Sequence, residues 1–191
     1  MKRLALSLLF TTLLMGCLDA PQAPEITPEE VPDDVDSWSY VASGVSAAAA
    51  DGSALNPYAS VQAAIDAAPV GSGVKIQAGI YEEALTIDKD VVLSGLPTAA
   101  QEVVLAHGDA AQVISISGGA VVRIEDLRVN GGQDAVVDVD GEGTSLKLTD
   151  AMINCTAPED LTDEAAGHGL VATNGAQLTV NGGKVTGCAM Y

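Results

Sequence analysis

Short apolar alternations follow one another through the middle of the chain. Segment 73–95 contains three of them, in which two apolar residues flank one other residue: Val74 and Ile76, Leu85 and Ile87, Val91 and Leu93. Alternation of this kind is typical of strands with one buried face. Gly or charged residues interrupt each alternation, so no stretch is long enough for an ordinary helix. The pattern predicts very short strands joined by frequent turns.

The alternations repeat in the second half of the chain, where segments beginning at Ile114, Val137 and Leu170 align with one another. Four sets of apolar positions correspond: Ile116, Val139 and Ala172; Val122, Leu146 and Leu178; Ile124, Leu148 and Val180; Val129, Ile153 and Val185. The first step of the third set is 24 positions and the second is 32. An acidic, turn-rich excursion at 156–168 accounts for the extra length.

A repeat of this length predicts a coil with three short strands per turn, that is, an all-β parallel β-helix. The period is too short for a propeller blade and lacks the pattern of a leucine-rich repeat. Stacked turns, here called rungs, would pair each strand in parallel with its equivalent one rung away. Inward residues would then form columns of like side chains, and the ends of the stack would need caps.

One short helix is predicted before the strands begin. Its apolar face is made of small residues at the spacing i, i+3, i+4 and i+7: Val61, Ala64, Ile65 and Ala68. Ser60 is a suitable N-cap and Pro69 a suitable stop. We expect this helix to cover the N-terminal end of the coil.

Residues 1–16 form a predicted export signal. Lys2 and Arg3 precede an apolar run from Leu4 to Met15 that is short for a membrane-spanning helix. The run ends in Gly16-Cys17, which resembles the bacterial lipoprotein signal, and that resemblance implies that the Cys17 thiol carries the lipid. It also implies anchoring in the cell envelope, at the outer membrane. The alternative is a plain secretory signal in which the Cys is accidental.

Residues 17–38 follow as a predicted tether, and residues 39–191 as the β-helix domain. The tether contains four prolines, seven acidic residues and no basic residue between Leu18 and Trp38. Such a segment buries too little apolar surface to fold, and its prolines and like charges keep it extended. It either holds the domain away from the membrane or serves as a recognition segment for a partner. Because the sequence shows no cap near Tyr191, we expect the domain to be incomplete at its C-terminus.

The composition narrows the range of partners. The formal net charge is −18, which argues against nucleic acid, because phosphate binding needs clustered Lys and Arg. The same charge disfavours anionic polysaccharides unless a cation such as Ca²⁺ bridges them. Aromatic residues make up only 3% of the chain, which limits stacking on sugar rings.

Segment 51–95 resembles the opening of pectin-lyase-like right-handed parallel β-helix proteins. The elements that carry the resemblance are Asp51-Gly52-Ser53, Asn56-Pro57-Tyr58, the 61–65 helix start, Gly79-Ile80-Tyr81 and the strands from Leu85 to Gly95. The resemblance implies a right-handed coil from about residue 38 onward. It says little about activity, because this fold carries lyases, hydrolases, esterases and adhesins without catalysis.

Asp126 and Asp150 are the candidate metal ligands. They occupy equivalent positions on successive rungs, about 5 Å apart. Two such carboxylates repel unless a cation bridges them or one is protonated. Lyases of the resembled fold use acidic clusters to bind Ca²⁺, and Asp138 and Asp140 add acids near a rung corner. The alternative, which we favour, is that all four are solvated turn residues.

Other polar residues suggest weaker hypotheses. Gln112 and the pair Gln133-Asp134 faintly resemble motifs of carbohydrate methylesterases, although the spacing is one residue short and no later Arg motif follows. Asn130 and Asn154 correspond on successive rungs, and we expect left-handed turns with stacked amides there. We expect His107 and His168 in exposed loops without metal.

Cys155 and Cys188 lie just after corresponding strands of neighbouring rungs. An exported protein meets an oxidising compartment, where two such residues form a disulfide or remain separate buried thiols.

The sequence therefore predicts a lipid-anchored envelope protein whose coil binds a glycan or another envelope partner. We assign no catalytic residue. One alternative is a polysaccharide lyase or carbohydrate esterase whose catalytic rungs are missing or degenerate, and another is a purely structural repeat domain.

Overall fold

The structure is a computed structural model that describes residues 35–155 and 167–188. The signal at 1–16, Cys17 and nearly all of the tether lie outside the described residues, as does most of the excursion at 156–168. The predictions for those segments remain predictions.

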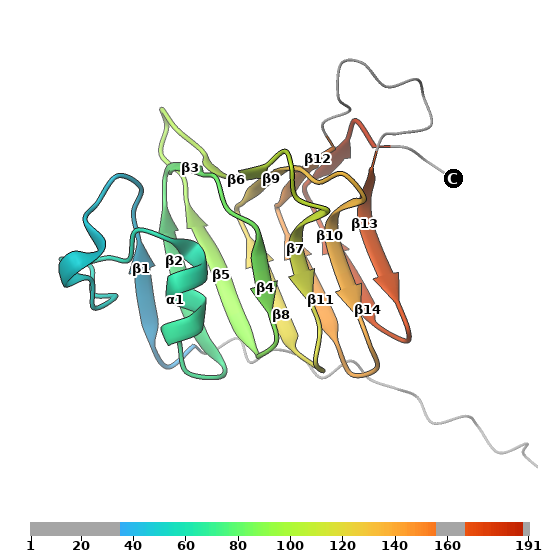
Figure 1. Ribbon diagram of the computed structural model, residues 1–191, viewed down its shortest axis with the longest axis horizontal. Coiled ribbons are helices and arrows are strands. Elements are labelled where there is room, and N and C mark those ends of the chain that lie inside the picture. The colour runs from blue at the N-terminus through green and yellow to red at the C-terminus, as the bar shows by residue number, and fades with distance from the viewer. Residues whose placement is uncertain (1–34, 156–166, 189–191) are drawn as a thin grey trace, which may run out of the picture.

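The described residues form a right-handed parallel β-helix, which confirms the predicted fold class. Every strand pairs in parallel with its equivalent on the next rung, and Figure 1 shows the rungs stacked along one axis. Sheet A contains β1 (Trp38–Val41), β2 (Ser72–Gln77), β5 (Val91–Leu96), β8 (Val121–Glu125), β11 (Ser145–Thr149) and β14 (Gln177–Asn181). Sheet B contains β3 (Gly79–Tyr81), β6 (Val103–His107), β9 (Arg128–Gly131), β12 (Met152–Asn154) and β15 (Lys184–Thr186). Sheet C contains β4 (Leu85–Ile87), β7 (Gln112–Ile116), β10 (Ala135–Asp140) and β13 (His168–Thr173).

The register of the sheets confirms all four predicted sets of corresponding positions. In sheet A, Leu148 pairs with Ile124 on one side and with Val180 on the other. The remaining sets pair in the same way: Val122, Leu146 and Leu178; Val129, Ile153 and Val185; Ile116, Val139 and Ala172. Inward side chains of successive rungs therefore stack directly on one another.

These inward columns form the core of the coil. Leu93 and Ile124 are 0% exposed and Leu148 is 1% exposed, and all three belong to one cluster of buried apolar residues. Full burial of one aliphatic side chain of this size contributes about 1.5–3 kcal/mol. Strands of three to six residues suffice because each strand also gains a complete hydrogen-bonded neighbour on the adjacent rung.

Strand β3 was missed among the alternations of segment 73–95. It is only three residues long, and its central residue, Ile80, points outward and is 61% exposed. Gly79 and Tyr81 are the inward positions. The alternation is hard to recognise in the sequence because Gly79 has no apolar side chain. The three alternations that were recognised correspond to β2, β4 and β5.

The N-terminal end is covered by α1 (Val61–Ala67), as predicted. The side chain of Ser60 is the N-cap and accepts from the backbone N–H of Ala63. Val61, Ala64 and Ile65 are buried against the core, and Figure 1 shows the helix at one end of the stack. A short 3₁₀ helix, η1 (Ala47–Ala49), precedes it. In the part of the chain that the structure describes, no helix is both long enough and apolar enough to cross a bilayer.

Three polar side chains tie α1 to the coil. Glu83, in the turn after β3, accepts from the N–H groups of Val61 (2.7 Å) and Gln62 (3.0 Å) and from the hydroxyl of Ser60 (2.7 Å). The amide of Gln62 donates to the carbonyl of Thr86 and accepts from its N–H, so it pairs with β4 as another strand would. Lys89 donates to the carbonyl oxygens of Asp66 and Ala68 at the other end of the helix.

We predict that Glu83→Ala destabilises the fold and that Glu82→Ala does not. The first change leaves two helix N–H groups and a hydroxyl without their charged acceptor, which costs about 1–3 kcal/mol. Glu82 is exposed, and its loss should change the free energy of unfolding by less than about 0.5 kcal/mol. Urea unfolding followed by circular dichroism measures both values. Equal effects of the two variants would contradict the capping role of Glu83.

Candidate functional site

The outer face of sheet B carries a row of side chains that changes character from rung to rung. Val104 pairs with Ile80 on one side and with Arg128 on the other, and Met152 pairs with Arg128 on the next rung. Because residues in register point to the same side of a sheet, these four side chains form one strip along the axis. The strip is apolar at three positions and positively charged at one.

A loop overhangs this strip and makes it a groove, called the sheet B groove below. On the three following rungs, only two residues separate the strand of sheet A from that of sheet B, whereas residues 97–102 separate β5 from β6. Thr98 and Gln101 close the longer loop on itself, because the Thr98 N–H donates to the Gln101 carbonyl (2.8 Å) and the Gln101 N–H donates to the Thr98 hydroxyl (3.1 Å).

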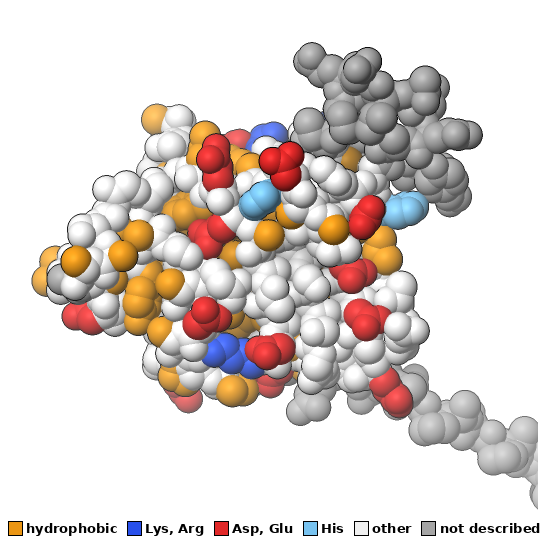
Figure 2. Space-filling view, viewed as in Figure 1, with side chains coloured by type: hydrophobic (Ala, Val, Ile, Leu, Met, Phe, Trp, Pro, Cys, Tyr) orange, Lys and Arg blue, Asp and Glu red, His pale blue; other side chains and the backbone are white. Residues whose placement is uncertain are grey.

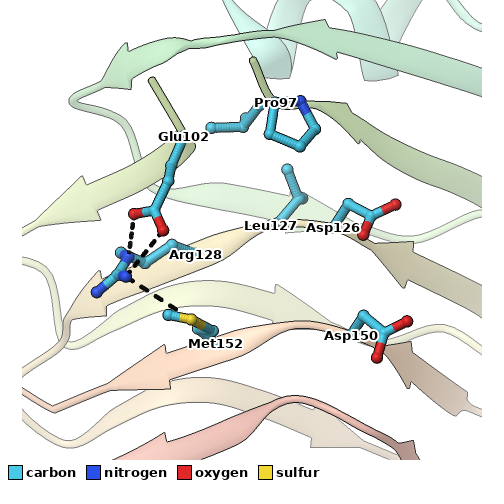
Figure 3. A pocket seen from close by; sticks show the side chains of 8 residues that line it. Pro97, Glu102, Asp126, Leu127, Arg128, Asp150 and Met152 are labelled. Carbon is cyan, nitrogen blue, oxygen red and sulfur yellow. Dashed lines mark hydrogen bonds and ion pairs between the residues drawn. The ribbon is translucent and has the colours of Figure 1, made fainter. Parts of the chain in front are cut away.

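The groove consists of two hollows that meet at Glu102. One, of about 530 Å³, lies between the loop and the strip and is lined by Ile80, Val104 and residues 98–102. The other, of about 140 Å³, lies over the next two rungs and is lined by Pro97, Glu102, Val103, Asp126, Leu127, Arg128, Asp150 and Met152. Figure 3 shows the second hollow.

An ion pair crosses the groove between its loop and its floor. The Nε of Arg128 lies 2.8 Å from Oε2 of Glu102, and Nη2 donates to Oε1 at 3.1 Å. The same Nη2 lies 3.7 Å from the sulfur of Met152. The two side chains are 30% and 56% exposed, so the pair is accessible from solvent and adds little to stability.

Asp126 and Asp150 occupy equivalent turns on successive rungs, as the repeat predicts, and both line the edge of this groove. Both have left-handed backbone conformations, with φ of 54° and 51°, in the turns between sheets A and B. The next rung has Gly182 in the corresponding turn, with φ of 77°. Short polar residues such as Asp tolerate this conformation better than most. The turn geometry alone therefore explains an Asp at each position.

The Ca²⁺ assignment to Asp126 and Asp150 stays a prediction. Figure 3 shows both carboxylates pointing to the same side, away from the Arg128–Glu102 pair. Ca²⁺ takes six to eight oxygen ligands. Within residues 35–155 and 167–188, no group of three or more acidic, His or Cys side chains is placed to hold a metal.

Asp138 and Asp140 lie on β10 at the outer face of sheet C. Their surroundings shift the pKa values of the two carboxyl groups in opposite directions. Burial, followed by the charge of Asp140, raises the pKa of Asp138. Hydrogen bonds from Thr173 (2.7 Å) and Asn174 (2.6 Å) lower the pKa of Asp140 because they stabilise its charged form.

The residues with a methylesterase-like pattern are not placed beside the groove. Gln133 and Asp134 lie in the turn after β9, whereas Asp126 lies in the turn before it, at the opposite end of that strand. Gln112 starts β7 and pairs with Ala135. The backbone N–H groups of Gln133 and Asp134 donate to Ala110 and Ala111, which is the bonding of a turn between rungs.

Asn130 and Asn154 correspond on successive rungs, as predicted, but the expectation that they turn the chain in the left-handed conformation is wrong. Both residues lie within strands and pair with each other in register, and the left-handed positions belong to Asp126 and Asp150 instead. The side-chain oxygen of Asn154 accepts from the Thr186 hydroxyl one rung further on, at 3.3 Å. A repeat alignment identifies equivalent positions but not which of them turns the chain.

The prediction of exposed histidines in loops is confirmed only in part. His107 is the last residue of β6 and half-buried, whereas His168 is exposed, as predicted, but is the first residue of β13. Both lie at strand ends rather than in loops.

Cys155 and Cys188 form a disulfide between the last two rungs, with their Cα atoms 4.9 Å apart. Cys188 lies one position further past its strand than Cys155 does. Gly187, with φ of 71°, makes the left-handed turn that takes up this extra residue, and a Cβ there would meet the carbonyl of Cys155. Closing a loop with a sequence separation of 33 stabilises the fold by about 3–4 kcal/mol on the chain-entropy account.

Sequence reasoning missed the Arg128–Glu102 pair and the groove it crosses. The two residues are 26 positions apart, and Glu102 belongs to an irregular loop. One signal was available, since Arg128 occupies the outward position next to Val129, where the two preceding strands and the following strand of sheet B have Ile80, Val104 and Met152 and only the next one has another base, Lys184.

No family model matches the chain, and no curated protein matches it. A search of solved structures finds a crystal structure of a pectin methylesterase mutant in complex with a hexasaccharide. It is 16% identical with a TM-score of 0.42, and the match covers 75% of this chain and 66% of that one. A likeness at this level does not extend to activity.

We predict opposite pH dependences for Asp140→Asn and Asp138→Asn. Because the pKa of Asp140 is lowered on folding, its charge stabilises the fold above the unfolded pKa, about 3.9, and this contribution is lost as the pH falls. Asp140→Asn should therefore lower the melting temperature at neutral pH, and the difference should shrink in acid. Because the pKa of Asp138 is raised, Asp138→Asn should raise the melting temperature at neutral pH, with no gain in acid.

Melting curves recorded by circular dichroism at a series of pH values from about 3 to 7 measure both variants, spanning the unfolded carboxyl pKa. Parallel curves for the two variants would contradict the opposite environments of these carboxylates.

Proposed function

We propose that this chain is a lipid-anchored cell-envelope protein whose sheet B groove binds a glycan and does not cleave it. The observation that carries the proposal is the groove itself, two accessible hollows that share Glu102 and lie beside residues 97–102 on successive rungs. The fold contributes a rigid floor, because β6, β9 and β12 beneath the groove pair with strands on both sides and β3 pairs with β6.

The geometry of the floor favours an extended, repeating ligand. Paired strands of neighbouring rungs are separated by about 4.8 Å, so the outward side chains of the strip repeat at that spacing. A glycan lying along the axis presents its sugar rings in succession to Ile80, Val104, Arg128 and Met152.

The chemistry of the lining favours a ligand with both apolar faces and hydroxyl groups. Ile80, Val104 and Met152 offer apolar contact, whereas Arg128, Glu102 and Gln101 offer donors and acceptors. Ligand sites typically combine an apolar surface with a few polar groups that fix orientation. Since Arg128 and Glu102 neutralise each other, this centre suits hydroxyl groups better than a strongly charged ligand.

The distribution of charge argues against a polyanion as the ligand. Figure 2 shows acidic side chains spread over one face of the molecule, with few basic ones among them. A net charge of −18 repels nucleic acid and highly charged polysaccharides. A neutral or weakly charged glycan avoids this cost.

The positions of the described acids at the groove support binding without catalysis. Glu102 is engaged by Arg128, and Asp126 and Asp150 point away from that pair (Figure 3). A general acid must reach the bond that it protonates, and these carboxylates do not converge on one point above the strip.

We predict that Arg128→Gln weakens glycan binding and that Lys147→Gln does not. Both substitutions remove one positive charge, but Lys147 lies on the outer face of sheet A. A hydrogen bond from a charged group contributes about 1.5–3 kcal/mol, so the first variant should weaken binding roughly tenfold or more. A glycan array identifies the ligand, and isothermal titration calorimetry measures the dissociation constants.

Three outcomes would contradict the groove as a non-catalytic glycan site. One is that no glycan on the array binds the chain, and another is that the two variants weaken binding equally. The third is turnover, detected as unsaturated products or released methanol when the chain is incubated with pectins. That result would favour the lyase or esterase alternative.

The anchoring part of the proposal rests on Gly16-Cys17 after a basic start and an apolar run. One acyl chain gives only marginal membrane binding, whereas several chains on one Cys hold a protein firmly. The acidic segment between Cys17 and β1 would hold the groove away from the bilayer.

We predict that cells expressing the chain incorporate radiolabelled palmitate into it, and that Cys17→Ser abolishes the label. Cys155 and Cys188 remain in this variant and serve as an internal control, because they are paired with each other in a disulfide and the proposal assigns no lipid to them. Equal labelling of the wild-type chain and Cys17→Ser would contradict the anchor. So would an unmodified, uncleaved N-terminus in the mass spectrum of the native protein.

A further inference from the structure

Glu102 lies where the two hollows of the sheet B groove meet, and the coil itself holds its backbone there. The N–H of Gly79, on the preceding rung, donates to the Glu102 carbonyl at 3.0 Å. Strand β6 begins at the next residue, Val103. The side chain of Glu102 is therefore presented to both hollows from the border between the loop and a paired strand.

The carboxylate of Glu102 takes up one whole side of the Arg128 guanidinium. Nε lies 2.8 Å from Oε2 and Nη2 donates to Oε1 at 3.1 Å, so each oxygen meets a different nitrogen (Figure 3). Arginine binds free carboxylate and phosphate groups through the same kind of paired, parallel N–H contact. Glu102 thus holds the place that an acidic group of a ligand would need.

The groups that remain available on this pair suit uncharged hydroxyl groups. Among the described residues, none is a hydrogen-bond partner of Nη1 of Arg128, and the Glu102 side chain is 56% exposed. A sugar hydroxyl both donates and accepts, so it can bond to Nη1 and to a Glu102 oxygen without separating the pair. A carboxylate only accepts, so it gains the paired contact with Arg128 only by displacing Glu102.

The other charges that line the groove also act against anionic ligands. Three acids, Glu102, Asp126 and Asp150, line the two hollows together with one base, Arg128. Lys184, the next base along sheet B, lines neither hollow. Charges of like sign placed against an unwanted ligand are a general source of specificity. An acidic sugar that displaced Glu102 would still meet negative potential at the edge of the groove.

We propose that Glu102 is the specificity-determining residue of the sheet B groove, and that it restricts the groove to uncharged sugars by occupying the anion-binding side of Arg128. The inference rests on the proposed glycan site and names the class of sugar that this site takes. Without Glu102, the guanidinium of Arg128 is free to bind the carboxylate of an acidic sugar. Loss of one acid then changes the selectivity while the floor of the groove stays the same.

The first test compares glucuronate with glucose, which differ by one carboxylate. Each sugar is titrated into the full, isotope-labelled chain in mild detergent. The backbone N–H resonances of Val104 and Met152, on the two sides of Arg128, report binding by nuclear magnetic resonance. We expect Glu102→Gln to raise the affinity for glucuronate relative to glucose roughly tenfold or more, because a charge-assisted contact with Arg128 becomes available.

Two further variants show whether the gain is specific. Glu82→Gln removes the same charge from an exposed acid that lines a separate hollow beside His107 and Asp109. It should change the ratio of the two affinities by less than about twofold. Glu102→Gln combined with Arg128→Gln should lose the gain, because no guanidinium remains to bind the carboxylate. The absence of a gain in Glu102→Gln, an equal gain in Glu82→Gln, or a gain that survives the loss of Arg128 would overturn the proposal.

A glycan array with the wild-type chain and Glu102→Gln separates this inference from the proposed function. Glu102→Gln should acquire uronate-bearing ligands that the wild-type chain rejects, and added salt should weaken these more than neutral ligands. If the wild-type chain binds no glycan but Glu102→Gln gains affinity for glucuronate, the glycan site is refuted and the control of Arg128 by Glu102 is supported. If a neutral glycan binds and Glu102→Gln gains nothing, only the role of Glu102 is refuted.

Discussion

Parallel hydrogen bonding between rungs is the constraint on which the whole structure depends. A strand such as β12 has three residues and no hairpin partner, so its backbone groups are satisfied only if the rungs before and after it lie in register. A shift by one residue would turn Ile153 outward and Met152 into the core. The inward columns of aliphatic residues fix that register, and the ladder and the core therefore stabilise each other along the axis.

Two further devices stabilise the stack, one at its N-terminal end and one between neighbouring rungs. At the N-terminal end, polar side chains replace strands: Gln62 bonds both backbone groups of Thr86, and Glu83 and Lys89 hold the two ends of α1. Further along the axis, the disulfide between Cys155 and Cys188 links two neighbouring rungs covalently.

The sequence repeat made the inward columns and their register predictable, whereas the contacts of residues outside the repeat were missed. The inward columns follow from like residues at constant spacing, so the register of Ile124, Leu148 and Val180 was predictable. The repeat also placed Asp126 and Asp150 at equivalent positions. It could not show that both turn the chain in the left-handed conformation, because aligned residue types do not reveal backbone angles. Glu102 belongs to no repeat, and its contact with Arg128 depends on the path of an irregular loop.

The same division explains where function can reside in such a fold. Inward positions are mostly aliphatic in the described rungs, because a polar side chain buried there needs a partner, as the Tyr81 hydroxyl has in the Gln77 carbonyl. Outward positions and turns carry no such restriction. The outward strip from Ile80 through Arg128 to Met152 changes from apolar to charged and back to apolar side chains, whereas the inward neighbours Leu105, Val129 and Ile153 are all aliphatic. A lengthened turn then adds a wall to the strip without disturbing the rungs on either side. The coil therefore works as a fixed frame on which a binding groove can be assembled one rung at a time.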